Sequence, residues 1–266
     1  MLVALLVSLL AGLATSIGGA LALHRRVLER PVLAAGLAFA AGAMLFVSFI
    51  EILPLGAESL STNLEPRIAN LVLYGVFFAG ILLVALIDRL LPSSLNPSKI
   101  EGKEEDLPRG TKASNKRLLR SGLLVAVVLA LHNFPEGMGV FFAASQDLSI
   151  GIPIAIAIAL HNIPEGIAIA APVYAATRSR SKAFWWATIS GLTEPLGALA
   201  GMALIAWAIP EALFGAVFGL VAGMMVFIAI DELLPAAKRY QTKSHQVVYG
   251  LLAGMAVVAM SLVLMS

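Results

Sequence analysis

The chain has 266 residues, of which 59% are hydrophobic and only 13% are charged. A water-soluble domain of this length cannot bury so much apolar surface, so lipid is the expected solvent. The net charge is +2, and the basic residues fall in loops rather than on one face, which argues against nucleic acid as a partner. The chain contains no cysteine, so any metal site must use nitrogen and oxygen ligands.

Eight apolar segments are long enough to cross a bilayer, which takes about 20 helical residues. In chain order they lie at 2–23, 31–54, 69–91, 120–144, 150–175, 183–208, 212–236 and 247–265. Met1 begins directly in apolar sequence without a basic leader, so we expect the first segment to stay as a helix. The pattern predicts an all-α polytopic membrane protein with eight transmembrane helices.

The basic residues predict the orientation of these helices. They occupy the first, third, fifth and seventh loops and the adjacent helix ends, and Arg67 is the single exception. Because cytoplasmic loops carry an excess of Lys and Arg, we expect these four loops in the cytoplasm and both termini outside, in the cell (inner) membrane. The polar segment 92–119 is expected to be a cytoplasmic linker between helices 1–3 (1–91) and helices 4 and 5 (120–175), with helices 6–8 at 183–266.

One eight-residue phrase occurs twice inside apolar sequence. Residues 130–137 read Ala-Leu-His-Asn-Phe-Pro-Glu-Gly, and residues 159–166 repeat them with Ile in place of Phe. Ionisable side chains are costly inside a membrane and are usually functional there. On a helix, His and Glu four residues apart share a face, and the proline between them leaves a main-chain carbonyl without its helical partner. Two copies predict a metal site made of His132, Glu136, His161 and Glu165.

These ligand types suit zinc, and also iron, cobalt and nickel, so they do not select one metal by themselves. An intramembrane metallohydrolase is the enzyme alternative, but zincin-type proteases need His-Glu-x-x-His, and this order does not occur in the chain. A metal-selective channel is a further alternative that the residues leave open. We expect a carrier rather than an enzyme.

A second repeat relates residues 41–54 to residues 222–235, with half of the aligned positions identical. The matches include Glu51 with Glu232 and Pro54 with Pro235. The two segments run in opposite directions in the predicted topology, so one pseudo-two-fold axis in the membrane plane explains them. Inverted repeats with a site at mid-membrane are common in secondary transporters. We expect Glu51, Asp231 and Glu232 to line the metal pathway. Basic residues lie close enough to Asp88 and Asp231 for ordinary ion pairs, which is the alternative for these two residues.

The paired His-Asn-x-Pro-Glu-Gly phrases resemble the signatures of helices 4 and 5 in the ZIP (Zrt-, Irt-like) family of divalent-metal transporters. The likeness extends over nearly the whole chain and includes residues 190–194 and 231–233. It implies a 3+2+3 inverted-repeat bundle, a homodimer, and a block of helices 1, 4, 5 and 6 that moves against a scaffold of helices 2, 3, 7 and 8.

The resemblance also implies a binuclear metal centre. The first position matches the four His and Glu residues named above, and Glu136 and Glu165 bridge to a second position formed with Asn133, Asn162 and Glu194. Zinc is the first expected cargo, with Fe²⁺, Co²⁺, Mn²⁺ and Cd²⁺ as alternatives, and no prosthetic group is expected. Divalent ions and the lipid bilayer are therefore the expected partners.

Overall fold

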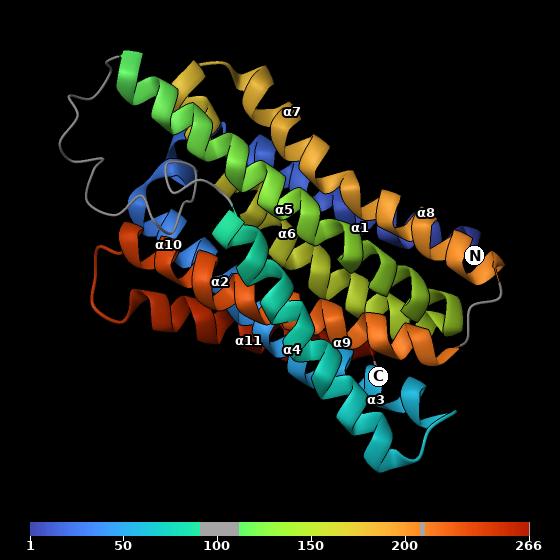
Figure 1. Ribbon diagram of the computed structural model, residues 1–266. Coiled ribbons are helices and arrows are strands. Elements are labelled where there is room, and N and C mark those ends of the chain that lie inside the picture. Colours follow the sequence, from blue (N-terminus) through green and yellow to red (C-terminus); the bar gives the residue numbers. More distant parts are fainter. Residues whose placement is uncertain (91–111, 208–210, 266) are drawn as a thin grey trace.

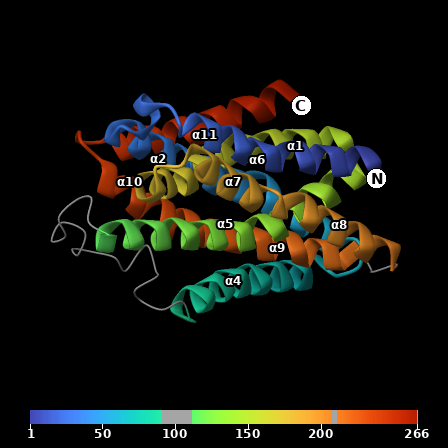
Figure 2. The same cartoon turned by 90° about the horizontal axis from the view of Figure 1, so that it is seen from above.

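The computed structural model describes residues 1–90, 112–207 and 211–265, and every regular element in these ranges is a helix. The predicted all-α fold is therefore confirmed. The helices are α1 (Leu2–Leu21), η1 (Arg25–Leu28), α2 (Arg30–Val47), η2 (Ser48–Ile52), α3 (Leu53–Ser61), α4 (Pro66–Leu90), α5 (Lys112–Gln146), α6 (Leu148–Thr177), α7 (Arg180–Gly191), α8 (Thr193–Ala206), α9 (Glu211–Ile228), η4 (Ala229–Leu233), α10 (Leu234–Tyr240) and α11 (Gln246–Met265). They form an elongated bundle in which α1 begins and α11 ends at the same end (Figures 1 and 2).

Seven stretches among the described residues are long and apolar enough to cross a membrane. Three of them join consecutive helices: Arg30–Ser61, Arg180–Ala206 and Leu213–Tyr240. The remaining expected span, 120–144, lies within the 35-residue helix α5. That helix begins at Lys112 rather than near residue 120, so the last part of the expected linker is helical. Residues 92–111 of the expected linker lie outside the described part of the chain.

The joined helices change direction or geometry close to prolines. Pro195 cannot donate a main-chain hydrogen bond, and α7 gives way to α8 at Leu192, where the carbonyl of Gly191 loses its helical partner. In α2–α3 and α9–α10 the change takes the form of the π-helical segments η2 and η4, each of which ends just before a Leu-Pro pair. A π-helix contains an extra residue per turn and is frequent at functional sites.

The helices pack as two groups. In the α5–α6 group, α1 packs along α6, α5 packs along α6 and α8, and α7 joins α1 and α6. In the α2–α9 group, α2 packs along α11, and α9 packs against α3 and α4, with α10 beside α2. The main hydrophobic core lies where the two groups meet and includes Met44, Phe141, Phe142, Ile158 and Met225.

Candidate metal centre

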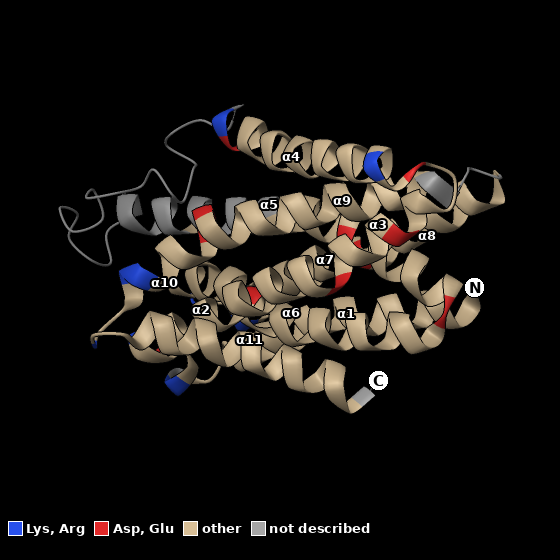
Figure 3. Cartoon of the chain, turned by 90° about the horizontal axis from the view of Figure 1, so that it is seen from below, with Lys and Arg blue, Asp and Glu red and all other residues tan. Residues whose placement is uncertain are grey.

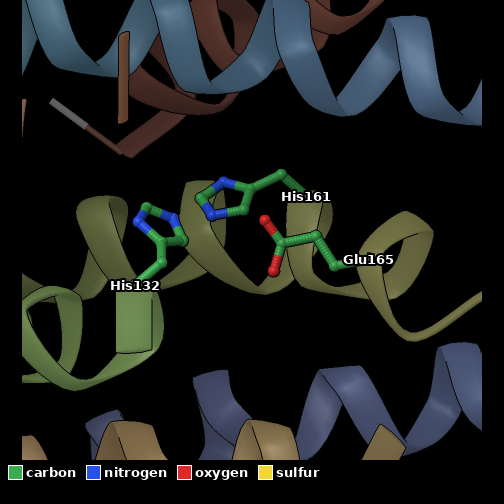
Figure 4. Close-up of side chains that lie close together, drawn as sticks. All are labelled: His132, His161 and Glu165. Carbon is green, nitrogen blue, oxygen red and sulfur yellow. The ribbon is translucent and has the colours of Figure 1, made fainter. Parts of the chain in front are cut away.

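The His and Glu residues of the two repeated phrases come together between α5 and α6. One ligand atom from each of His132, His161 and Glu165 lies within 4.8 Å of the other two. Figure 4 shows both imidazole rings and the carboxylate turned toward a common point, with His132 on α5 and the other two residues on α6. The expected four-residue cluster is completed by Glu136, whose carboxylate reaches both imidazoles.

Glu136 lies between the two histidines. Its Oε1 is 2.8 Å from Nε2 of His161, and its Oε2 is 3.5 Å from Nε2 of His132. The shorter contact requires a proton on one partner, and a bound cation would take the place of that proton. A divalent ion here would be held by imidazole nitrogen and carboxylate oxygen, a ligand set well suited to zinc.

All seven residues that we predicted from the sequence to form the metal centre are buried, each with at most 1% of its surface exposed. They are His132, Asn133, Glu136, His161, Asn162, Glu165 and Glu194. Both carboxylate oxygens of Glu165, one of Glu194, and the amide oxygens of both asparagines have no hydrogen-bond partner within the described part of the chain. Buried polar atoms without partners are costly, and a cation is the partner that would satisfy several of them at once.

Glu194 and Asn162 form the edge of the centre nearest α1 and α8. Nδ2 of Asn162 donates to Oε2 of Glu194 at 2.7 Å and to the carbonyl of Ala11 at 3.0 Å. Asn133 is held differently, because its Nδ2 makes one long contact of 3.5 Å with the carbonyl of Ser190. The structure thus links Asn162 with Glu194 directly, and their shared role in a second metal position stays a prediction.

The glycine that ends each repeated phrase has a packing role that the sequence reasoning missed. A Cβ at Gly137 would collide with the carbonyl of Glu194, and one at Gly166 would collide with the carbonyl of Thr15. Small residues let membrane helices approach closely. These two glycines therefore allow α8 and α1 to pack closely against the centre. The signal available in the sequence was the glycine that directly follows the glutamate in each repeated phrase.

The three residues expected along the pathway do not join this centre. Glu51 is half-buried in η2, and Asp231 and Glu232 are half-buried in η4. Asp231 and Glu232 instead lie with Asp88 of α4, one carboxylate oxygen of each being within 4.8 Å of the other two. Asp88 thus joins a second acidic group, and the ordinary ion pairs expected for it stay a prediction.

A small apolar cavity lies beside the centre, between the two helix groups. Glu136 is the one ionisable side chain that lines it, and the other lining residues are Ile52, Gly139, Val140, Ile154, Ile158, Phe218 and Val221. The cavity therefore lies between Glu136 and η2, in which Ile52 directly follows Glu51.

Comparisons with known proteins agree with this geometry. A family model described as ZIP Zinc transporter matches residues 97–262. The chain belongs to the ZIP zinc transporter family. ZIP proteins are transporters, so this chain is not an enzyme, and the metallohydrolase alternative is excluded. The resemblance based on the two repeated phrases is confirmed.

Curated bacterial members of the ZIP family align with almost the whole chain. The zinc transporter ZupT of Corynebacterium aurimucosum is 50% identical over 258 residues, which are 96% of this chain and 94% of the relative. ZupT of Chlorobium phaeovibrioides is 48% identical over 266 residues, which cover 99% and 98% of the two chains. ZupT of Streptococcus mutans is 45% identical over 261 residues, which cover 98% and 97%. Together with the apolar helices, this family membership makes the chain a multi-pass membrane protein.

Proposed function

We propose that this ZIP protein is a carrier that imports divalent metal ions, zinc first, into the cytoplasm. The observation that carries the proposal is the buried cluster of two imidazoles and two carboxylates at His132, Glu136, His161 and Glu165. Relatives named zinc transporter ZupT support zinc as the cargo. The same ligand types suit Fe²⁺, Co²⁺, Mn²⁺ and Cd²⁺, which we propose as weaker substrates.

The centre is proposed to be binuclear. Asn133, Asn162 and Glu194 would hold a second ion, with Glu136 and Glu165 bridging the two positions, and the unpaired amide and carboxylate oxygens support this assignment. Three carboxylates then face the four positive charges of two divalent ions. A site that is close to neutral but not overcharged can hold an ion at low dielectric and still release it, as transport requires.

We propose that both termini lie outside the cell and that the opposite end of the bundle is cytoplasmic. Lys and Arg of α10 and of the nearby loops gather at the end away from the start of α1 (Figure 3). The first turn of α4, which contains Arg67, lies at the opposite end. This distribution supports the orientation expected from the positive-inside rule and an inner-membrane location.

A 3+2+3 inverted-repeat architecture is the proposed basis of alternating access, with α5 and α6 (120–175) between the repeats at 1–91 and 183–266. The two π-helical segments support this proposal because they coincide in the repeat alignment. Ser48–Ile52 aligns with Ala229–Leu233, and each segment carries the glutamate of its repeat, Glu51 or Glu232. Chance similarity between apolar helices does not account for matched π-helices.

We further propose a route into and out of the centre. Ions would enter past Glu51, next to the cavity that Glu136 lines, and leave past Asp231 and Glu232, which lie with Asp88 at the other end of the membrane. The α5–α6 group would move against the α2–α9 group. In a homodimer, which the resemblance implies, the α2–α9 group would form the fixed contact between subunits.

Zinc flux into proteoliposomes tests the proposed function. The purified protein should show saturable zinc uptake, and Glu136→Ala and Glu165→Ala should each abolish it while the protein still folds and inserts. Near-normal uptake by either well-folded variant would overturn the site assignment. Flux that does not saturate and approaches diffusive rates would favour the channel alternative over the carrier.

A further inference from the structure

Helix α1 carries no charged residue, yet its main chain contacts the metal centre. The carbonyl of Ala11 accepts a hydrogen bond from Nδ2 of Asn162 at 3.0 Å, and both residues are buried. A main-chain carbonyl inside a helix normally accepts a hydrogen bond only from the N–H four residues later in the same helix. Here it also receives a side-chain donor from α6, at the position next to Glu194.

Both hydrogens of the Asn162 amide are committed. A primary amide has two N–H donors. In Asn162 one N–H donates to the carbonyl of Ala11, and the other donates to Oε2 of Glu194 at 2.7 Å. The assignment of nitrogen and oxygen follows from this network, because both partners are acceptors. Oδ1 of Asn162 is consequently turned away from both partners, is fully buried, and has no hydrogen-bond partner within the described residues.

Gly12 allows α1 to come this close. A Cβ at this position would lie 2.5 Å from the carbonyl oxygen of Gly191 and 3.1 Å from both Cβ of Glu194 and Cδ of Pro195. Any side chain on residue 12 would therefore push α1 away from α7 and α8, and would move the carbonyl of Ala11 away from Asn162.

We propose that Ala11 and Gly12 are positioning residues of the metal centre. Through the Ala11 carbonyl, α1 fixes the Asn162 amide so that Oδ1 faces the second ion, and the same amide holds Glu194 in place before any ion arrives. This inference rests on the proposed binuclear centre and adds α1 to its structure. Partners that orient a metal ligand typically contribute about 10- to 100-fold to metal affinity.

Asn133, the equivalent residue of the other repeated phrase, provides an internal contrast. Its Nδ2 makes a single contact of 3.5 Å with the carbonyl of Ser190, and its Oδ1 also lacks a partner within the described residues. Its orientation is therefore less constrained than that of Asn162. The two asparagines should respond differently to the loss of their N–H donors.

Titration of purified, metal-free protein with Co²⁺, followed by its visible absorption, tests the proposal. Gly12→Ala should weaken binding of the second equivalent by about 10- to 100-fold, change its spectrum, and leave the first equivalent unaffected. Gly36→Ala on α2 is the matched control, because a Cβ there meets nothing within 4 Å. Equal affinity for the second equivalent in wild type and Gly12→Ala would overturn the proposal.

Asn162→Asp gives a second, independent measurement if Gly12→Ala does not fold. Asp has no N–H donor and would place an acceptor against Glu194 and the Ala11 carbonyl, so in EDTA the variant should unfold several degrees below Asn133→Asp. Added Co²⁺ should remove most of that difference. Equal unfolding temperatures in EDTA would overturn the proposal. A wild-type protein that binds one Co²⁺ only would overturn it while leaving the four-ligand centre standing, and one that binds none would overturn both.

Discussion

The contacts inside the α5–α6 group differ in kind from the contacts between the two helix groups. Inside the group, glycines of one helix lie directly against the main chain of a neighbouring helix. A Cβ at Gly197 would collide with the carbonyl of Phe134, and one at Gly18 would collide with the carbonyl of Ile163. Between the groups, a Cβ at Gly139 would lie 3.9 Å from the ring of Phe218, and one at Gly36 would meet nothing within 4 Å.

This difference separates a tightly fitted body from an adaptable interface. Main-chain contacts through glycine leave little room for displacement, so the α5–α6 group holds the proposed metal ligands in a fixed arrangement. Apolar side chains and two small cavities line the boundary with the α2–α9 group. We propose that the groups move against each other here, because a shift would exchange one set of similar contacts for another. All seven proposed ligands lie on α5, α6 and α8, within the tightly fitted body.

The largest expected effect comes from locking the boundary between the groups. Gly36 of α2 and Ile167 of α6 line the same cavity, and the native chain has no cysteine to interfere. A Gly36→Cys, Ile167→Cys double variant joined by a reducible bifunctional thiol reagent should lose nearly all zinc transport and regain it on reduction. The single-cysteine variants treated in the same way are the controls. Full transport by the cross-linked protein would show that the groups do not move against each other.

Glycine substitution should distinguish the two kinds of contact by stability. Gly197→Ala should destabilise the protein by about 1–3 kcal/mol, because an overpacked interface must shift to accept a methyl group. Gly36→Ala should be neutral or stabilising by up to about 1 kcal/mol, since Ala is the better helix former and its methyl group meets no atom. Thermal unfolding in detergent measures both. Equal destabilisation by the two substitutions would contradict the distinction.

Acid should weaken zinc binding at the centre. A zinc ion binds neutral imidazole and ionised carboxylate, so protons compete for the same atoms. We expect zinc affinity to fall at least about tenfold between about pH 7 and about pH 5. Calorimetry in detergent isolates this effect from any proton gradient across the membrane. An affinity that stays constant over this range would mean that His132 and His161 are not ligands.

The smallest effect concerns Asp147, which lies at the turn between α5 and α6. Its carboxylate accepts a hydrogen bond from the main-chain N–H of Ser149 at 2.8 Å, and this bond lowers the pKa of Asp147 below its ordinary value. A lowered pKa in the folded state means that the carboxylate stabilises the protein above its unfolded pKa and loses that effect as pH falls through the folded value.

Asp147→Ala should therefore lower the unfolding temperature slightly at neutral pH, and the difference should vanish in acid. Asp147→Asn is the matched control, because asparagine also caps helices well but does not titrate in this range. If Asp147→Ala and the wild type differed by the same amount at every pH, the cap would not act through the charge.

The sequence predicted the helices, and it also predicted that the His and Glu side chains of the two repeated phrases lie close together. Both predictions rest on simple requirements that lipid imposes. Apolar segments must be helical to pair their main-chain groups, and a doubled His-Asn-x-Pro-Glu-Gly phrase has few structural explanations. Helical spacing places His132 and Glu136 on one face of α5, and His161 and Glu165 on one face of α6.

Other features depend on contacts that residue patterns do not specify. The alignment of the second repeat matched Glu51 with Glu232, but periodicity does not reveal an extra residue in a helical turn, so η2 and η4 were missed. Asp88 joins Asp231 and Glu232 only because α4 packs along α9. The bond from Asn162 to Ala11 involves a main-chain carbonyl, for which the sequence carries no side-chain signal.

We propose that side chains of the α5–α6 group alone bind the transported ion. Diffraction from crystals soaked in zinc, measured at the zinc absorption edge, locates the ion directly. We expect the strongest anomalous peak between His132, Glu136, His161 and Glu165, with any second peak beside Asn162 and Glu194. A strongest peak at Asp88, Asp231 and Glu232, with none between the two histidines, would contradict it.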